Sequence, residues 1–160
     1  MPLWFAKVER ALRCIEEHDP RRLAGLRRDV RRIIVTAADG NHYLHRWRAI
    51  VLKWPVIFRR DAESNALTLV HEATHARIDR RGIPYTRELR HRIEAACVGQ
   101  EVAFARRLPN GARRVEEIRK VLESPWWRDE QLLERRLQAL RDRGVPSWFV
   151  RLIGAAVTRR

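Results

Sequence analysis

The stretch Leu67-Thr68-Leu69-Val70-His71-Glu72-Ala73-Thr74-His75-Ala76-Arg77-Ile78 contains the pattern HExxH among apolar or small residues, with no proline. If this stretch is helical, His71 and His75 lie one turn apart on the same face and offer two imidazole nitrogens to one metal ion. Glu72 lies beside them, where its carboxylate reaches a water on that ion. Because zinc takes neutral nitrogen ligands and needs a base beside the water it activates, the pattern predicts a catalytic zinc site.

Capping residues predict where this helix and its successor begin and end. Asp61 or Ser64 is expected to accept the first hydrogen bond of the HExxH helix. At the C-terminus of this helix, Arg80 and Arg81 complement the helix dipole, and Gly82 is expected to end the helix. Thr86 is expected to cap the next helix, which runs to the stop signal at residues 108–111.

A third protein ligand is expected, because a catalytic zinc usually has three and keeps its fourth position for water. Eighteen residues separate His75 from Glu94, which lies on the next expected helix. HExxH followed by eighteen residues and a glutamate resembles the pattern of the gluzincins, the zinc peptidases that include thermolysin and the alanyl aminopeptidase type. The resemblance covers roughly residues 61–108 and implies that His71, His75 and Glu94 hold one Zn²⁺ per chain.

Other residues compete for the position of third ligand. His91 lies on the same expected helix as Glu94, nearly one turn earlier, and is an alternative. Asp79 lies one turn after His75 and is a second alternative, although it shares a helix with both histidines. Cys97 is disfavoured, because it follows Glu94 by only three residues and the chain has no CxxC.

The resemblance to gluzincins also implies an activity. The expected function is that of a hydrolase, a zinc metallopeptidase that cleaves peptide bonds with a zinc-activated water. Glu72 is the expected general base, which accepts the proton of the water and hands it to the leaving amine. Gluzincins often stabilise the oxyanion with a Tyr or His, for which Tyr85 is the first candidate and His91 the second.

One position departs from the gluzincin pattern. Many gluzincins carry an aspartate one turn after the third ligand, which orients the first histidine, and Val98 stands at that position here. Glu101 lies seven residues after Glu94, so the two carboxylates project almost together from a helix. Glu101 is therefore a candidate hydrogen-bond acceptor for a ligand histidine, with an exposed surface glutamate as the alternative.

The expected fold class is α+β, a minimal zincin-like core in which helices flank a small antiparallel sheet. Helices are predicted at residues 3–17 and 20–28, the second starting with proline at its first position. A β-hairpin follows, with strands at residues 31–37 and 42–53, on the basis of β-branched residues and alternation. Residues 56–58 are interpreted as a third strand at a sheet edge.

The length predicts one zincin-like domain over residues 1–160. Residues 1–60 are expected to form the N-terminal helices and the small sheet, 61–108 the zinc-binding helix pair, and 112–160 a C-terminal helical extension. Within the extension, helices are expected at 115–123, from Pro125 to Arg143 after a cap at Ser124, and from Pro146 onward, with Gly144 as a stop.

Arginine dominates the charge of the chain. The 34 basic against 20 acidic residues give a net charge of +14, which attracts polyanions nonspecifically. The arginines are spread along the chain rather than gathered in one block, which favours a solvated surface. A basic nucleic-acid-binding or regulatory protein with a structural or vestigial zinc site is therefore the alternative function. For a peptidase, a peptide or protein substrate is the expected partner, and the small size predicts restricted, even single-substrate, activity.

The remaining composition predicts a cytoplasmic protein. No apolar run reaches the ~18 residues of a membrane span. The first residues lack the ordered regions of a signal peptide. Cys14 and Cys97 do not make a disulfide framework, and each is expected to occupy a buried helix face as a small apolar residue.

Overall fold

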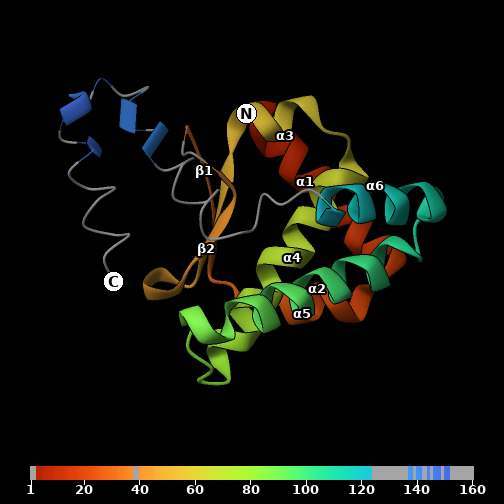
Figure 1. Cartoon of the computed structure of the whole chain (residues 1–160). Helices are drawn as coiled ribbons and strands as arrows, with labels where there is room; N and C mark the ends of the chain where they lie inside the picture. Colours follow the sequence, from red (N-terminus) through yellow and green to blue (C-terminus); the bar gives the residue numbers. More distant parts are fainter. Residues whose placement is uncertain are drawn as a thin grey trace. The chain divides into compact units, whose positions relative to one another are not determined.

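A computed structural model describes residues 3–37 and 40–123 and, in the C-terminal part, residues 137, 138, 140, 141, 144, 146–148, 150 and 151. The chain divides into two compact units, residues 1–118 and 119–160. The first unit is α+β, mostly helical with a small three-stranded sheet, as predicted for the fold class (Figure 1). In the second unit, Gly144 has a φ of 77°, and most of the two helices predicted after Ser124 lies outside the described residues.

The two N-terminal helices are confirmed. They are α1 (Leu3–His18) and α2 (Pro20–Asp29). A carboxylate oxygen of Asp19 accepts a hydrogen bond of 3.1 Å from the backbone N–H of Arg22, which caps α2. Asp19 also directly follows the last residue of α1, and both helices bury apolar faces in one core.

The prediction of a β-hairpin and an antiparallel sheet is wrong. The strands are β1 (Arg32–Thr36), β2 (His42–Leu44) and β3 (Ala49–Lys53), in the order β1–β3–β2. β1 pairs in parallel with β3, and β2 pairs antiparallel with β3, so the sheet is mixed. Of the two segments predicted to form the hairpin, 31–37 and 42–53, only residues 32–36 and 49–53 pair with each other, and they pair in parallel.

Burial explains why β3 takes the central position. Residues 49–52 are a continuous apolar run, and all of them are buried. A strand that is buried in this way is covered on both faces and pairs at both edges. Alternation of apolar and polar residues, on which the hairpin prediction relied, is instead typical of a strand with one solvent-exposed face. The predicted long strand is also broken by a 3₁₀ turn, η1 (His45–Trp47), after which Arg48 adopts the left-handed conformation with φ 47°, which is uncommon outside glycine.

The predicted edge strand at residues 56–58 is a helix. α3 (Trp54–Arg59) has Pro55 in its first turn, where a fixed φ and a missing N–H suit a helix start. A proline also suits a sheet edge, and the short apolar run beside it does not distinguish the two structures. Ile57 is the buried residue of α3 and packs in the main core.

The HExxH segment forms the middle of α4 (Ala62–Arg80), the helix against which most of the unit packs. Of the two candidate caps, Asp61 is the N-cap, because its side chain accepts from the Ser64 N–H at 2.8 Å. Gly82, with a φ of 74°, follows the helix and donates its N–H to the carbonyl of Asp79 at 2.8 Å, as expected of a glycine that ends a helix. α4 contacts α1, α2, α5 and the strands β2 and β3.

The glutamate-bearing helix is α5 (Arg87–Ala105), and α6 (Gly111–Glu123) follows it. Thr86 is at the N-cap position of α5 as predicted, but its side chain makes no capping hydrogen bond. α6 begins at Gly111, before the predicted start at residue 115. A Cβ at Gly111 would lie 2.7 Å from the Ala105 carbonyl oxygen, so glycine permits the tight turn in which the start of α6 meets the end of α5.

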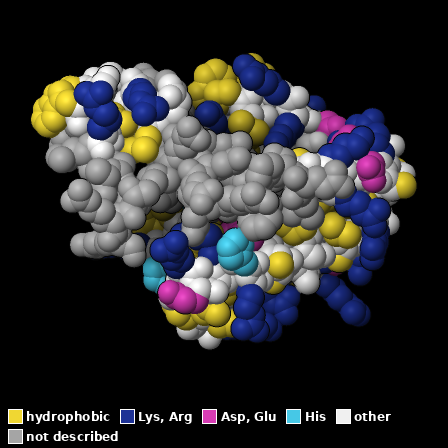
Figure 2. Space-filling view, in the orientation of Figure 1, with side chains coloured by type: hydrophobic (Ala, Val, Ile, Leu, Met, Phe, Trp, Pro, Cys, Tyr) yellow, Lys and Arg dark blue, Asp and Glu magenta, His cyan; other side chains and the backbone are white. Residues whose placement is uncertain are grey.

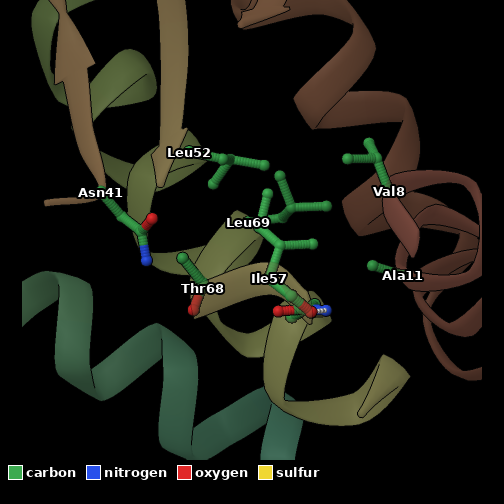
Figure 3. A pocket seen from close by; sticks show the side chains of 8 residues that line it. Val8, Ala11, Asn41, Leu52, Ile57, Thr68 and Leu69 are labelled. Carbon is green, nitrogen blue, oxygen red and sulfur yellow. Dashed lines mark hydrogen bonds between the residues drawn. The ribbon is translucent and has the colours of Figure 1, made fainter. Parts of the chain in front are cut away.

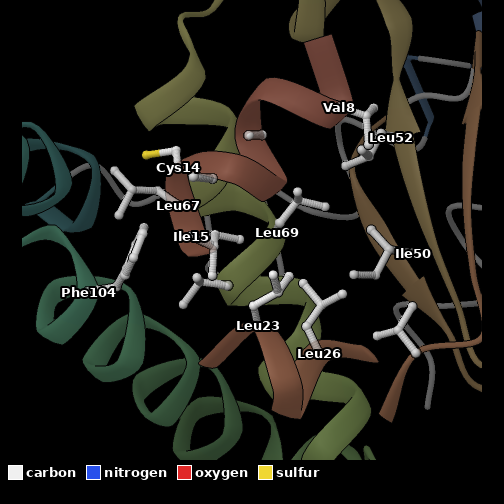
Figure 4. Packing of buried hydrophobic residues seen from close by; sticks show 14 of the residues in the cluster. Val8, Cys14, Ile15, Leu23, Leu26, Ile50, Leu52, Leu67, Leu69 and Phe104 are labelled. Carbon is white, nitrogen blue, oxygen red and sulfur yellow. The ribbon is translucent and has the colours of Figure 1, made fainter. Parts of the chain in front are cut away.

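The hydrophobic core joins the helices to the sheet. It includes Ile15 of α1, Leu23 of α2, Ile50 of β3, Leu69 of α4 and Phe104 of α5, all at most 2% exposed (Figure 4). A small cavity of about 10 Å³ lies in the packing between α1, β3, α3 and α4 (Figure 3). Lys and Arg appear at several separate places on the face drawn in Figure 2. None of the described helices is long and apolar enough to cross a bilayer.

Candidate metal centre

The two histidines of the motif lie side by side on α4. Their ring centroids are 5.2 Å apart, and their side chains are only 16% and 14% exposed for His71 and His75. Because four residues make slightly more than one turn, both imidazoles leave α4 on the side that faces α5. The sequence prediction that these two residues share one face is therefore met in the structure.

Glu94 of α5 contacts both histidines. Its Oε2 lies 3.3 Å from Nε2 of His71, and its Oε1 lies 3.5 Å from Nε2 of His75. A charge-assisted hydrogen bond is shorter, about 2.7–2.9 Å. Two ligands of one tetrahedral zinc, each about 2.0–2.1 Å from the ion, are about 3.3 Å apart. The distance from Glu94 to each imidazole therefore fits that of two ligands of one metal ion.

The other nitrogen of His71 contacts Glu101. Nδ1 of His71 lies 3.2 Å from Oε2 of Glu101, and the Glu101 side chain is 20% exposed. A ligand histidine usually donates its second N–H to a carboxylate or carbonyl, which fixes the ring and leaves the first nitrogen for the metal. Glu101 is placed to accept such a hydrogen bond, and Val98 stands where the gluzincin pattern has an aspartate.

The charges within the cluster act on one another. Burial by itself would lower the pKa of His71, but the Glu101 and Glu94 carboxylates outweigh it and raise that pKa to about 10. Burial lowers the pKa of His75 to about 4. Burial opposes ionisation of Glu94, yet its contacts with His71 and Tyr85 lower the pKa of its carboxyl to about 2. Glu94 is thus an ionised carboxylate paired with a protonated His71, and a metal ion that bound both side chains would displace the imidazole proton.

Glu72 is buried beside the two histidines, with 6% of its surface exposed. Burial raises the pKa of its carboxyl to about 7, and the nearby charge of His71 opposes this rise. The backbone N–H of Tyr43, in β2, also opposes this rise. The strand therefore lies close to the carboxylate of the expected general base.

Tyr85 reaches the cluster from the turn before α5. Its hydroxyl donates to Oε1 of Glu94 at 2.6 Å, and its ring packs edge-on against that of His75 at 5.6 Å between centroids. Burial and the contact with Glu94 both raise the pKa of Tyr85, so the phenol stays protonated and can donate. His91, the other oxyanion candidate, is exposed on the surface of α5.

Asp79, one alternative for the third ligand, is engaged elsewhere. The Tyr43 hydroxyl donates to Oδ2 of Asp79 at 2.8 Å, and Nδ1 of His45 contacts its Oδ1. His91, the other alternative, is exposed, whereas Glu94 is partly buried against both imidazoles. Geometry thus favours Glu94 over both.

Cys97 is disfavoured by the sequence, yet the structure brings it to the histidines. His71, His75 and Cys97 form a group that could hold a metal ion, with one ligand atom of each within 4.8 Å of the others. Burial raises the pKa of the Cys97 thiol, and the charges of Glu94 and Glu72 raise it further. The sequence did contain a signal for this placement: Cys97 lies three residues after Glu94, and residues i and i+3 share a helix face.

Comparisons with protein-family models, with curated proteins and with solved structures found no match to this chain.

Proposed function

We propose that this chain is a zinc-dependent metallopeptidase in which His71, His75 and Glu94 hold the metal ion. The observation that carries the proposal is the pair of contacts from the two oxygens of Glu94 to Nε2 of both histidines, at 3.3 and 3.5 Å. Two imidazoles and one carboxylate suit zinc, and three protein ligands leave a position open for chemistry.

Zinc, when bound, supplies a Lewis acid that lowers the pKa of water and polarises a carbonyl. The residues of the chain supply the proton transfers. Glu72 adjoins His71 and is buried, so its carboxylate takes a proton from the attacking water and returns it to the leaving amine.

Tyr85 is the favoured donor to the oxyanion. Its hydroxyl lies 2.6 Å from the oxygen of Glu94 that contacts His75, and the residue is 53% exposed, so it borders both the metal ligands and solvent. A donor at this edge stabilises charge that develops on a substrate carbonyl. The alternative donor, His91, is supported only by its position on α5.

The substrate is proposed to lie along β2. This strand is at an edge of the sheet, since β3 pairs with it on one side only. It also contacts α4, and the backbone N–H of Tyr43 in its centre reaches Glu72. An extended peptide recognises such an edge through backbone hydrogen bonds. The short strand suits a short recognised segment.

The substitution Glu72→Gln tests the proposal when zinc content and peptide cleavage are measured for the parent and for the variant. The parent should carry near one zinc per chain and cleave peptides. Glu72→Gln should keep its zinc and lose activity by about 10²–10⁴-fold, the usual effect of a general base. Glu16→Gln, on the exposed surface of α1, is the matched control. A variant as active as the parent, or a folded parent without zinc, would refute the proposal.

Polyanion binding is the second candidate function. The net charge is +14. A groove of about 540 Å³ between α2, α4 and α5 is lined by five arginines and only two aspartates, Asp19 and Asp29. Arg21 and Arg77 are exposed at this groove. RNA or DNA affinity that falls steeply with salt, survives His71→Ala and is lost with Arg21→Ala/Arg77→Ala would favour this function.

A further inference from the structure

We infer that Cys97 is a fourth ligand of the metal in the resting protein and keeps the site closed until its thiolate leaves. The inference rests on the proposed function, in which His71, His75 and Glu94 hold the ion. Zinc sites with four protein ligands are closed, whereas catalytic sites keep one position open. A ligand that can leave would therefore make the peptidase latent.

The position of the sulfur is the first reason. Sγ of Cys97 lies within 4.8 Å of a nitrogen of His71 and of His75. For a tetrahedral zinc with a sulfur at about 2.3 Å and nitrogens at about 2.0–2.1 Å, sulfur and nitrogen are about 3.5 Å apart. A displacement on the order of 1 Å reaches that spacing. Cys97 also lies one turn after Glu94, so both side chains leave α5 toward the histidines.

The surroundings of Cys97 are the second reason, and Cys14 provides the comparison. Both cysteines are free and buried. Cys14 belongs to the hydrophobic core of the described residues, among whose side chains Figure 4 shows it. Cys97 is fully buried but does not belong to that core. Two imidazoles lie within reach of its sulfur. Such surroundings suit a ligand of a cation better than an apolar packing residue.

The step that closes the site is a ligand exchange without oxidation or reduction. With the metal bound, the Cys97 sulfur would replace the water of the fourth position: the S–H bond breaks, and the proton and the displaced water pass to bulk solvent. The reverse step returns a proton to the sulfur and opens the fourth position. Peptide cleavage then requires the open form, so the apparent rate scales with the fraction of molecules in which Cys97 has left.

Cobalt substitution of the full chain tests the ligand. The Co²⁺ form of the parent should absorb in the near ultraviolet through sulfur-to-cobalt charge transfer. Cys97→Ser should keep Co²⁺ and lose this band, and Cys14→Ser should keep both. A parent without the band, or a band that persists in Cys97→Ser, overturns the inference. X-ray absorption at the zinc edge of the unmodified parent checks the result without a variant: a sulfur shell at about 2.3 Å supports it, and nitrogen and oxygen alone refute it.

Peptidase assays separate this inference from the proposed function. Cys97→Ala should cleave peptides on the order of tenfold faster than the parent if about nine molecules in ten are closed. An unchanged rate in Cys97→Ala overturns the latency. If the sulfur band is present and neither protein cleaves peptides, Cys97 stands as a ligand and the peptidase proposal falls. If the parent is an active peptidase without the band, the proposed function stands and the role of Cys97 falls.

Discussion

His71 Nδ1 and Glu101 Oε2 lie 3.2 Å apart, between α4 and α5. This contact leaves Nε2 of His71 to face Glu94, at 3.3 Å. In the proposed metal site, Glu101 orients His71, whereas Val98 stands where the gluzincin pattern has an aspartate. Glu101 lies two turns after Glu94, and residues seven apart project almost together from a helix.

Glu101→Gln should weaken zinc binding about 10–100-fold, the usual effect of removing a partner of a ligand histidine. The fold should be retained, since the amide is nearly isosteric with the carboxylate. Competition with a chromophoric chelator measures the affinity. Glu116→Gln, exposed on α6, is the control and should bind zinc like the parent. Equal affinities in all three proteins would mean that Glu101 does not orient His71.

Tyr85→Phe should lower kcat about 10²–10³-fold while zinc stays bound, because one donor to the oxyanion is lost. The KM should change little, since the donor acts in the transition state. Steady-state kinetics at saturating zinc give both constants. A lower zinc affinity with an unchanged kcat would assign Tyr85 to holding Glu94, which its hydroxyl contacts at 2.6 Å.

Gly111→Ala should destabilise the protein by about 1–2 kcal/mol, the usual cost of forcing extra volume into a packed site. The reason is that its Cβ would meet the Ala105 carbonyl oxygen at 2.7 Å, so backbone must shift. Gly99→Ala is the matched comparison within α5, since nothing lies within 4 Å of a Cβ there. That variant should gain about 0.4–1 kcal/mol from the reduced entropy of the unfolded chain. Urea unfolding measures both; equal shifts in the two variants would contradict the close approach at Gly111.

Asp29→Asn should destabilise the protein near neutral pH and much less in acid. The hydrogen bond from Arg28 lowers the pKa of the Asp29 carboxyl to about 2 against its burial, and Arg80 adds a second contact. A carboxyl with a depressed pKa stabilises the folded state above its unfolded pKa of about 3.9. This stabilisation is lost as the pH falls through about 2.

The expected difference between the parent and Asp29→Asn is about 1–2 kcal/mol at pH 7, reduced by the exposure of both arginines. Unfolding by urea at pH 7 and in steps down to about pH 2 measures it. The difference should shrink as the pH falls below about 4. A difference that is constant over this range would show that ionisation of Asp29 does not contribute.

Local chemistry made several features predictable from the chain alone. Asp19 and Asp61 cap the helices that follow them, and Gly82 ends α4, because capping depends on residues only a few positions apart. The shared face of His71 and His75 follows from the helical repeat in the same way. The spacing to Glu94 predicted that the third ligand candidate lies on the next helix, α5, from which it contacts both histidines.

Other features depended on contacts between distant segments. β3 lies between β1 and β2 because its buried run needs partners on both sides, and alternation along one segment does not reveal them. Residues 56–58 form a helix rather than a strand, since a short apolar run beside a proline fits both. The approach of α5 to α4 brings Glu101 and Cys97 to the histidines. Side chains that meet across two helices are chosen by packing, which acts over the whole unit, whereas caps and periodicity act within a few turns.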